Sequence, residues 1–373
     1  MKKILFLFGT RPEAIKMAPL IRCFSKDNNY DVRVGVTAQH REMLDQVLSF
    51  FEVNVDYDLN IMTHNQTLHQ LTSDLISRIT TEILVQEHFD FIFVQGDTTT
   101  VLAASIASFY QKIKIIHIEA GLRSNDMDSP FPEEMNRVLT SRLASIHFCP
   151  TQNSKQNLLT ENITENVFVV GNTVIDALLT GLEKVNNSSE EILLNKYNYI
   201  DFNKKIILVT CHRRENFGKP FEEICSALLE IADLFKDSIQ IIYPVHLNPN
   251  VKEVAHSVLQ RQNIKLISPL EYPELIWMMN KSYIILTDSG GIQEEAPSLG
   301  KPVLVMREVT ERTEGVDAGT AILVGSSKQK IVLETQKLLS DKNYYNLISK
   351  ASNPYGDGTT SQKIKEIISG FNN

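Results

Sequence analysis

Acidic side chains follow short apolar runs at several places in the chain, and they are the first residues that suggest chemistry. Asp97 and Glu119 each follow such a run, and Glu133 opens a helical stretch behind a loop stiffened by two prolines. Asp97 fits a helix cap and a functional carboxylate equally well, and attraction to a helix N-terminus accounts for Glu133. Glu119 is the better functional candidate, because a carboxylate at the end of an apolar strand must find a partner or have a raised pKa.

Residues 287–295, with the sequence TDSGGIQEE, suit an anionic ligand. They lie between an apolar run that predicts a buried strand and a stretch of helical composition, so Ser289, Gly290 and Gly291 fall at a helix N-terminus. Free backbone N–H groups and the helix dipole point outward there, and the two glycines let a phosphate approach the backbone closely. Glu295 lies about one turn into the helix, where its carboxylate could accept ribose hydroxyls. A tight turn with an acidic first turn explains the same residues equally well.

Basic residues follow two of the predicted strands. Arg11 and Lys16 come after the first apolar run, where they either hold an anion or are solvated charges at a helix start. His212 stands before two arginines, the first of them Arg213, at the end of another strand. This setting favours the handling of an anion or a proton over a purely structural role.

Signatures of several bound cofactors are absent from the sequence. There is no GxGxxG motif after the first strand, no GxxxxGK[ST] motif and no HExxH motif. Their absence weighs against a nicotinamide cofactor, a P-loop nucleotide hydrolase and a zinc peptidase. We therefore expect neither a cofactor nor a catalytic metal.

Bulk composition narrows the class of protein. The chain has 373 residues, 43% of them hydrophobic and 22% charged, which is typical of globular proteins and long enough for two domains. A net charge of −8 and a pI near 5.7 argue against nucleic-acid binding. No apolar run approaches the roughly 20 residues of a membrane span, and the N-terminal run is too short for a signal peptide. The four cysteines show no CxxC spacing, so we expect a reduced, cytoplasmic protein.

Alternation of short apolar runs with amphipathic stretches predicts an α/β fold, with parallel sheets covered by helices on both faces. There are too many candidate strands for one open sheet, so we expect two Rossmann-like, doubly wound domains that face each other across a cleft. We place them at residues 1–172 and 173–357, with a final helix over 358–373 that returns to the first domain. The predicted strands are 3–8, 32–36, 91–95, 113–118, 145–149, 167–170, 206–210, 239–243, 264–267, 283–287 and 303–306. The predicted helices include 39–51, 99–111, 134–144, 221–236 and 327–340.

Seven segments carry a more specific signal, because they occur in one order along the chain. They are GTRPEAIKMAPL (9–20), TAQHREMLDQ (37–46), QGDTT (95–99), IEAGLR (118–123), GNTVID (171–176), HRREN (212–216) and DSGGIQEE (288–295). In these segments, and as far as residues 353–356, the chain resembles the bacterial family of non-hydrolysing UDP-N-acetylglucosamine 2-epimerases.

The resemblance implies a GT-B-like fold, a cytoplasmic homodimer, and reversible conversion of UDP-N-acetylglucosamine (UDP-GlcNAc) to UDP-N-acetylmannosamine (UDP-ManNAc) for an envelope polysaccharide. The proton on C2 of the sugar is poorly acidic because no carbonyl stands next to C2. Elimination of UDP from C1 while a base removes this proton gives 2-acetamidoglucal, and re-addition with protonation from the other face gives the epimer. This route needs a base, an acid, a clamp on the diphosphate and exclusion of water.

The resemblance also assigns roles to individual residues. The acid/base groups would be Asp97, Glu119, Glu133 and His212. The residues that bind UDP and the sugar would be Arg11, Lys16, Arg213, Leu270, Leu275, Ser289, Gly290, Gly291, Glu295 and Arg312. The positions that match a regulatory nucleotide site of some members are Gln39, Glu42, Glu134, Arg213 and His246. Because Glu42 stands where strongly regulated members carry Gln, and Asn65 where they carry Arg, we expect no allosteric activation.

Three other functions are compatible with the same motifs. A hydrolysing epimerase would release UDP and free sugar. A GT-B glycosyltransferase would pass the sugar to an acceptor, but the first domain shows no apolar or basic acceptor surface in its sequence. A nucleotide-sugar-binding regulator would tolerate replacement of Asp97 or Glu119.

Overall fold

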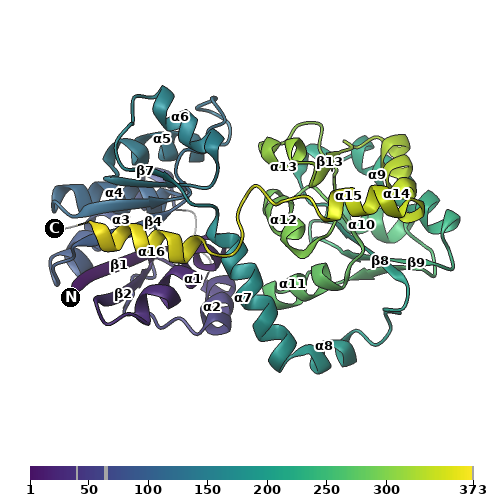
Figure 1. Cartoon of the computed structure of the whole chain (residues 1–373), viewed down its shortest axis with the longest axis horizontal. Coiled ribbons are helices and arrows are strands. Elements are labelled where there is room, and N and C mark those ends of the chain that lie inside the picture. Colours follow the sequence, from purple (N-terminus) through teal and green to yellow (C-terminus); the bar gives the residue numbers. More distant parts are fainter. Residues whose placement is uncertain (39–40, 63–65, 372–373) are drawn as a thin grey trace. The chain divides into compact units, whose positions relative to one another are not determined.

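The chain divides into two compact units, which Figure 1 shows in the colours of the sequence. The first unit joins Met1–Ala177 to Tyr355–Asn373, and the second is Leu178–Pro354. The first boundary lies inside a helix, α7 (Thr173–Ser188). The computed structural model describes residues 1–38, 41–62 and 66–371.

Seven parallel strands form the sheet of the first unit, in the order β3-β2-β1-β4-β5-β6-β7. Its central strands are almost wholly apolar, because helices cover both faces of a parallel sheet. Phe6 and Phe93, from neighbouring strands, stack with ring centroids 4.5 Å apart. The strands are β1 (Lys2–Phe8), β2 (Tyr30–Val36), β3 (Tyr57–Asp58), β4 (Phe91–Gln95), β5 (Lys114–Ile118), β6 (Ile146–Cys149) and β7 (Val167–Val169).

Helices pack on this sheet, and the last helix of the chain is one of them. It lies beside the first helix, so the end of the chain packs against its beginning (Figure 1). The first helix has Pro12 in its opening turn, where the missing N–H costs nothing. The helices of this unit, besides the start of α7, are α1 (Arg11–Ser25), α2 (Arg41–Phe51), α3 (Leu68–Ile79), α4 (Thr99–Tyr110), α5 (Glu133–Leu143), α6 (Gln152–Thr160) and α16 (Thr360–Gly370).

The second unit has a six-stranded parallel sheet in the order β10-β9-β8-β11-β12-β13. Its single tryptophan, Trp277, is fully buried in helix α11. The strands are β8 (Lys205–Thr210), β9 (Ile239–Pro244), β10 (Ile264–Ile267), β11 (Ile284–Thr287), β12 (Val303–Val305) and β13 (Ala321–Leu323). The helices are α8 (Glu190–Lys196), α9 (Lys219–Leu234), α10 (Pro249–Val258), α11 (Tyr272–Lys281), α12 (Gly290–Glu295), α13 (Thr313–Asp317), α14 (Lys328–Ser340) and α15 (Lys342–Ser349).

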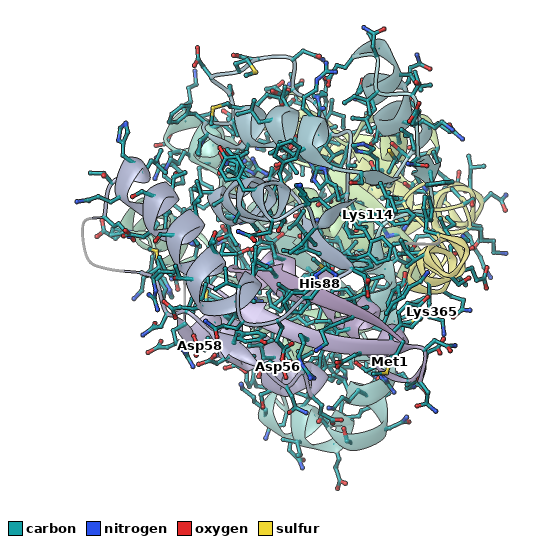
Figure 2. The ribbon with its side chains drawn as sticks, turned by 90° about the vertical axis from the view of Figure 1, so that its left-hand side faces the viewer. Met1, Asp56, Asp58, His88, Lys114 and Lys365 are labelled. Atoms are coloured by element: carbon teal, nitrogen blue, oxygen red, sulfur yellow. The ribbon has the colours of Figure 1, made fainter. Side chains whose placement is uncertain are left out.

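Two edge strands, β3 and β13, were not predicted from the sequence. They span only 2 and 3 residues, too few to show a period-2 pattern. β3 is held in place by its neighbours: Asp56, labelled with Asp58 in Figure 2, accepts a hydrogen bond from Val34 N at 2.8 Å. Edge positions of this kind are fixed by tertiary contacts rather than by the local sequence.

Each sheet has one place where the chain reverses the direction in which strands are added. In the first unit this switch point lies between the paired strands β1 and β4, and in the second it lies between β8 and β11. Loops that leave neighbouring strands here diverge to opposite faces, and ligands of open α/β sheets bind at the carboxyl edge beside them. The motifs found in the sequence fall on these loops: residues 9–13 follow β1, 96–98 follow β4, 211–216 follow β8 and 288–291 follow β11.

The predicted fold class, α/β with two Rossmann-like domains, is confirmed by the two parallel sheets. Among the described residues, no helix combines the length and the apolar character needed to span a bilayer.

Candidate active site

Glu119 is the most constrained side chain at the carboxyl edge of the first sheet. It follows β5, its side chain is 6% exposed, and Oε1 lies 2.6 Å from Lys16 Nζ. Asn172 Nδ2 donates to Oε1 at 2.9 Å, and Gln95 Nε2 donates to Oε2. We expected this carboxylate to have a partner or a raised pKa, and the Lys16 ammonium is that partner.

The backbone of Glu119 is itself unusual. Its φ is +63°, in the left-handed region that residues with a Cβ seldom adopt. A non-glycine residue held there costs about 1–3 kcal/mol, so the surrounding contacts must hold this backbone in place. The following turn depends on Gly121, because a Cβ at that position would lie 2.1 Å from Ser154 O.

Asp97 does not cap the helix that follows it. The N-cap of α4 is Thr98, and Asp97 Oδ2 instead accepts a hydrogen bond from Arg137 Nε at 3.2 Å. The main-chain carbonyl of Asp97 accepts a second bond, from Asn136 Nδ2 at 2.9 Å. The side chain is 26% exposed, so the carboxylate is fixed by a cation yet open to a ligand.

Glu133 and Glu134 begin α5 but have different surroundings. Glu133 is the first residue of the helix and is partly exposed, as predicted for a helix start. Glu134 is 1% exposed and accepts hydrogen bonds from Ser124 N at 3.0 Å and from Arg137 Nη1 at 2.6 Å. Arg137 therefore bridges Glu134 to Asp97. The regulatory role assigned to Glu134 stays a prediction, and its carboxylate here holds a loop.

Glu13 joins the two loops at the switch point of the first sheet. It is 2% exposed; Oε2 accepts from Gly9 N at 2.8 Å and Thr10 N at 2.7 Å, and Oε1 accepts from Thr98 Oγ1 at 2.6 Å. Burial raises the pKa of Glu13, although these hydrogen bonds act in the opposite direction. The loop with Arg11, a partly buried residue at the first position of α1, is thereby tied to the loop with Asp97.

Two buried histidines lie side by side behind the carboxylates. His117 on β5 and His147 on β6 are paired in register. Burial lowers the pKa of His117 to about 4 and that of His147 to about 3, so both are neutral at pH 7. His117 Nε2 lies 2.8 Å from Gly96 O and must donate to it, because a carbonyl oxygen only accepts. This bond fixes the residue before Asp97.

The turn after β11 in the second unit has the predicted form. Ser289 is the N-cap of α12, which begins with Gly290 and Gly291. A Cβ on Gly290 would lie 3.3 Å from Arg312 Cζ, so glycine leaves room for that guanidinium. Arg312 Nε lies 2.9 Å from Glu294 Oε1.

Glu295 is also placed at this turn. It is 6% exposed, and a Cβ on Gly291 would lie 3.8 Å from its Oε2. Its carboxylate therefore lies beside the glycine turn, and its predicted role in binding ribose stays a prediction.

His212 and Arg213 follow β8 at the same sheet edge. The His212 side chain is 44% exposed and stacks on His246 with ring centroids 5.7 Å apart. Burial lowers the pKa of His212. The neighbouring His246 and Arg213 lower this pKa further, whereas the Asp288 carboxylate acts in the opposite direction. Arg213 Nη2 lies 3.8 Å from Glu311 Oε1, and Arg307 Nη1 lies 2.6 Å from the other oxygen of the same carboxylate.

The remaining predicted residues that the structure describes are Leu270, Leu275 and Glu42. Leu270 precedes α11 and Leu275 lies in its first turns, and both are partly buried. Glu42 is exposed on α2. Gln39 and Asn65 lie outside the described residues, so their predicted roles are not addressed. In the part of the chain that the structure describes, no group of three or more His, Cys, Asp or Glu residues is arranged to hold a metal ion.

Sequence reasoning missed three residues that organise these clusters: Glu13, Arg137 and Asp288. All three belong to segments that drew attention for other reasons. Their partners lie far away in sequence, 85 positions from Glu13 to Thr98, 40 from Arg137 to Asp97 and 76 from Asp288 to His212. Asp288 had a local signal, because it directly follows β11, whereas Glu13 and Arg137 lie inside the helices α1 and α5.

Comparison with known proteins agrees with this architecture. The family model described as UDP-N-acetylglucosamine 2-epimerase matches residues 22–369. The UDP-N-acetylglucosamine 2-epimerase of Escherichia coli K12 is 55% identical over 371 residues, covering 98% of each chain.

Two solved structures extend the comparison to three dimensions. The UDP-GlcNAc 2-epimerase of Neisseria meningitidis, bound to UDP-GlcNAc, superposes with a TM-score of 0.90 at 50% identity and covers 99% of this chain and 100% of its own. The Methanocaldococcus jannaschii enzyme, in complex with UDP-GlcNAc and UDP, gives a TM-score of 0.79 at 35% identity over 98% of this chain and 99% of its own. With its fold, motifs and full-length similarity all in agreement, the chain belongs to the UDP-N-acetylglucosamine 2-epimerase family.

Proposed function

We propose that this protein interconverts UDP-GlcNAc and UDP-ManNAc without hydrolysis, by elimination and re-addition of UDP. The observation that carries the proposal is the pair of carboxylates at the ends of neighbouring strands, Glu119 after β5 and Asp97 after β4, each held by a cation. Family membership supplies the substrate class, since relatives in this family bind UDP-GlcNAc.

The reaction proceeds in two halves that balance each other. In the first, a base takes the proton from C2 while the C1–O bond to the diphosphate breaks, which leaves 2-acetamidoglucal and UDP. In the second, a proton is added to C2 from the opposite face and the C1–O bond forms again. No electrons are gained or lost overall, so the chemistry requires acid/base groups and a stabilised diphosphate only.

Residues of the first unit supply the proton transfers in this proposal. Glu119 is paired with the Lys16 ammonium and is therefore suited to act as a base, and Asp97 and Glu133 supply the other proton-transfer positions. The Gln95 and Asn172 amides fix the orientation of the Glu119 carboxylate, which is the kind of support that proton transfer at a defined carbon requires.

Residues of the second unit bind the nucleotide. The Ser289-Gly290-Gly291 turn together with Arg312 and Arg213 offers backbone N–H groups and two guanidinium groups to the diphosphate. Glu295 accepts the ribose hydroxyls, and Leu270 and Leu275 provide apolar contact for the uracil. His212 assists at the diphosphate or in proton transfer.

Proton NMR of the purified protein with UDP-GlcNAc in D2O tests the function directly. We expect UDP-ManNAc with deuterium at C2 in both nucleotide sugars and no loss of their summed concentration. Stoichiometric appearance of UDP and free N-acetylmannosamine would instead identify a hydrolysing epimerase. Turnover that depends on an added sugar acceptor would identify a glycosyltransferase.

Charge-neutral variants test the assignment of residues. Glu119→Gln and Asp97→Asn keep the side-chain shape but remove the base, and each should lower kcat by about 10²–10⁴-fold. Glu82→Gln is the matched control, because this exposed carboxylate pairs with Arg78 on the surface of the same unit. A Glu119→Gln variant with the wild-type rate would rule out an acid/base role for this residue.

The proposal extends to assembly and to the use of the product. By family resemblance, the protein acts as a homodimer and supplies N-acetylmannosamine units for an envelope polysaccharide. Analytical ultracentrifugation at micromolar concentration tests the first point, and loss of ManNAc from isolated envelope polysaccharide on deletion of the gene tests the second.

A further inference from the structure

Asp288 is a buried carboxylate that has no role in the chemistry described so far. It directly follows β11, and its side chain is 0% exposed. Its Oδ2 accepts hydrogen bonds from His212 N at 2.9 Å, Arg213 N at 2.8 Å and Asn216 Nδ2 at 3.0 Å. This single oxygen therefore anchors the loop that carries His212 and Arg213.

The other carboxylate oxygen faces the His212 ring. Oδ1 is buried and accepts no hydrogen bond from the described residues, and His212 Nδ1 lies 3.4 Å from it. A carboxylate oxygen can only accept, so the ring nitrogen beside it is favoured as the protonated one. The contact is electrostatic rather than a hydrogen bond, and it favours the Nδ1–H tautomer, because that tautomer places an N–H hydrogen instead of a lone pair beside the carboxylate oxygen.

Two described neighbours, His246 and Arg213, do not offer the ring an alternative acceptor. The His246 ring stacks on His212 at an interplanar angle of 18°, and its Nδ1 already accepts a hydrogen bond from Asn248 N at 3.1 Å. Arg213 is a cation and only donates. Of these three neighbours, Asp288 is the one that places an acceptor beside His212 Nδ1.

We propose that Asp288 is a positioning residue, which holds His212 as the Nδ1–H tautomer so that Nε2 takes up and returns a proton during the reaction. The inference rests on the proposed function. When Nε2 gains a proton, the Asp288 carboxylate stabilises the imidazolium from the opposite side of the ring without accepting the proton itself. The proton leaves again from Nε2, so the enzyme is unchanged after each turnover.

Asp288→Asn separates this role from the anchoring of the loop. The Asn oxygen still accepts from the two main-chain N–H groups and from Asn216, which turns the Asn NH2 group toward His212 Nδ1. Because an NH2 group only donates, the ring must switch to the Nε2–H tautomer. We expect kcat to fall by about 10²-fold or more and the Kd for UDP, measured by calorimetry, to change by less than about 3-fold.

Nitrogen-15 NMR reads the tautomer without any dependence on activity. The signals of His212, one of nine histidines, are assigned from the peaks lost in His212→Gln. We expect the two-bond ¹⁵N–¹H pattern of a protonated Nδ1 in the wild type and of a protonated Nε2 in Asp288→Asn. The same pattern in both proteins would overturn the proposal.

A double-mutant cycle tests whether Asp288 acts through His212. If it does, Asp288→Asn should cause little further loss of kcat in the His212→Gln background, whereas independent effects would multiply. Multiplication would overturn the proposal. Asp233→Asn, an exposed aspartate of the same unit paired with Arg261, is the matched control and should leave kcat and the NMR pattern unchanged.

Failure of this inference and failure of the proposed function give different results. If the wild-type protein shows no epimerisation in D2O, the function fails, while the NMR experiment still reports the His212 tautomer. If epimerisation occurs and Asp288→Asn retains the wild-type kcat, only the role of Asp288 is wrong.

Discussion

A buried carboxylate ties the loops at the switch point of each sheet, but the two carboxylates are used differently. Glu13 links the loops after β1 and β4, and all of its bonds go to neutral donors: two main-chain N–H groups and the Thr98 hydroxyl. Asp288 links the loops after β8 and β11, and it uses one oxygen for neutral donors and turns the other toward His212. The first is a structural tie, and the second also controls a titratable ring.

The cations near these sites also differ between the two units, in their exposure and in how closely they pair with carboxylates. In the first unit, Lys16 and Arg137 form close pairs with Glu119 and Asp97, and their side chains are only 15% and 13% exposed. In the second unit, the Arg213 side chain is 37% exposed and its contact with Glu311 is long, at 3.8 Å. Cations in tight pairs hold the neighbouring carboxylates in place, whereas looser, more exposed cations are available to an incoming anion. We therefore expect proton transfer to depend on the first unit and nucleotide affinity on the second.

The largest expected effect comes from removing one cation from each unit in separate variants. Lys16→Met removes the cation that pairs with the Glu119 carboxylate, so kcat should fall by about 10²–10³-fold, equivalent to about 3–4 kcal/mol. The Kd for UDP should stay within about 3-fold of the wild type. Arg213→Met should do the reverse and weaken UDP binding by about 10–100-fold, as loss of a charge-assisted bond predicts.

Calorimetric titration with UDP, alongside initial rates of epimerisation, gives both quantities for each variant. Equal losses of UDP affinity in Lys16→Met and Arg213→Met would contradict this assignment of proton transfer and nucleotide binding to different units. They would place Lys16 at the diphosphate, as the family resemblance alone suggested.

A smaller effect, on stability, tests the structural tie. Glu13→Ala leaves two buried N–H groups without an acceptor and opens a cavity, so the free energy of unfolding of the first unit should fall by about 2–4 kcal/mol. Glu13→Gln can satisfy the same donors with its oxygen and donate its NH2 group to Thr98, so it should differ from the wild type by less than about 1 kcal/mol at pH 7.

Urea unfolding followed by circular dichroism measures this loss, and fluorescence of Trp277 reports the second unit separately.

The raised pKa of Glu13 also makes the stability of the first unit depend on pH, and the direction of that dependence follows from the shift. Between the ordinary carboxyl pKa and the raised one, the folded protein binds more protons than the unfolded chain, so this group lowers stability as pH rises. Glu13→Gln lacks that contribution. A Glu13→Ala variant as stable as Glu13→Gln would show that the tie is dispensable.

The smallest effect is a slope of stability against pH in the first unit. His117 and His147 have pKa values of about 4 and about 3 in the folded protein, against 6.5 when unperturbed. Below pH 6.5 the unfolded chain takes up protons that the folded protein does not, so each histidine lowers the free energy of unfolding by about 1.4 kcal/mol per pH unit as pH falls from about 6 to about 4.

His147→Gln should reduce this slope by the contribution of one histidine, about 1.4 kcal/mol per pH unit. This reduction does not depend on how the substitution affects stability at pH 7. Urea unfolding at pH 7, 6 and 5 measures the slope. An unchanged slope in the variant would mean that His147 is protonated in the folded state.

The sequence by itself determined the class of fold and the position of most elements. Eleven of the strands were visible as short apolar runs, because strands covered on both faces must be apolar throughout. Glycines and an N-cap serine marked the turn into α12, because that backbone geometry admits few other residues. Motifs directly after strands indicated which loops carry function, because the carboxyl edge of a parallel sheet collects them.

Only the tertiary structure decided which of these groups meet. Lys16 and Glu119 are 103 positions apart, and neither local sequence indicates that the two side chains pair. The left-handed backbone of Glu119, the bridge from Arg137 to Asp97 and the orientation of His212 by Asp288 likewise depend on which strands become neighbours. The physical reason is that a local sequence fixes hydrophobic period and turn chemistry, whereas the burial and pairing of a charge are set by residues brought together from distant parts of the chain.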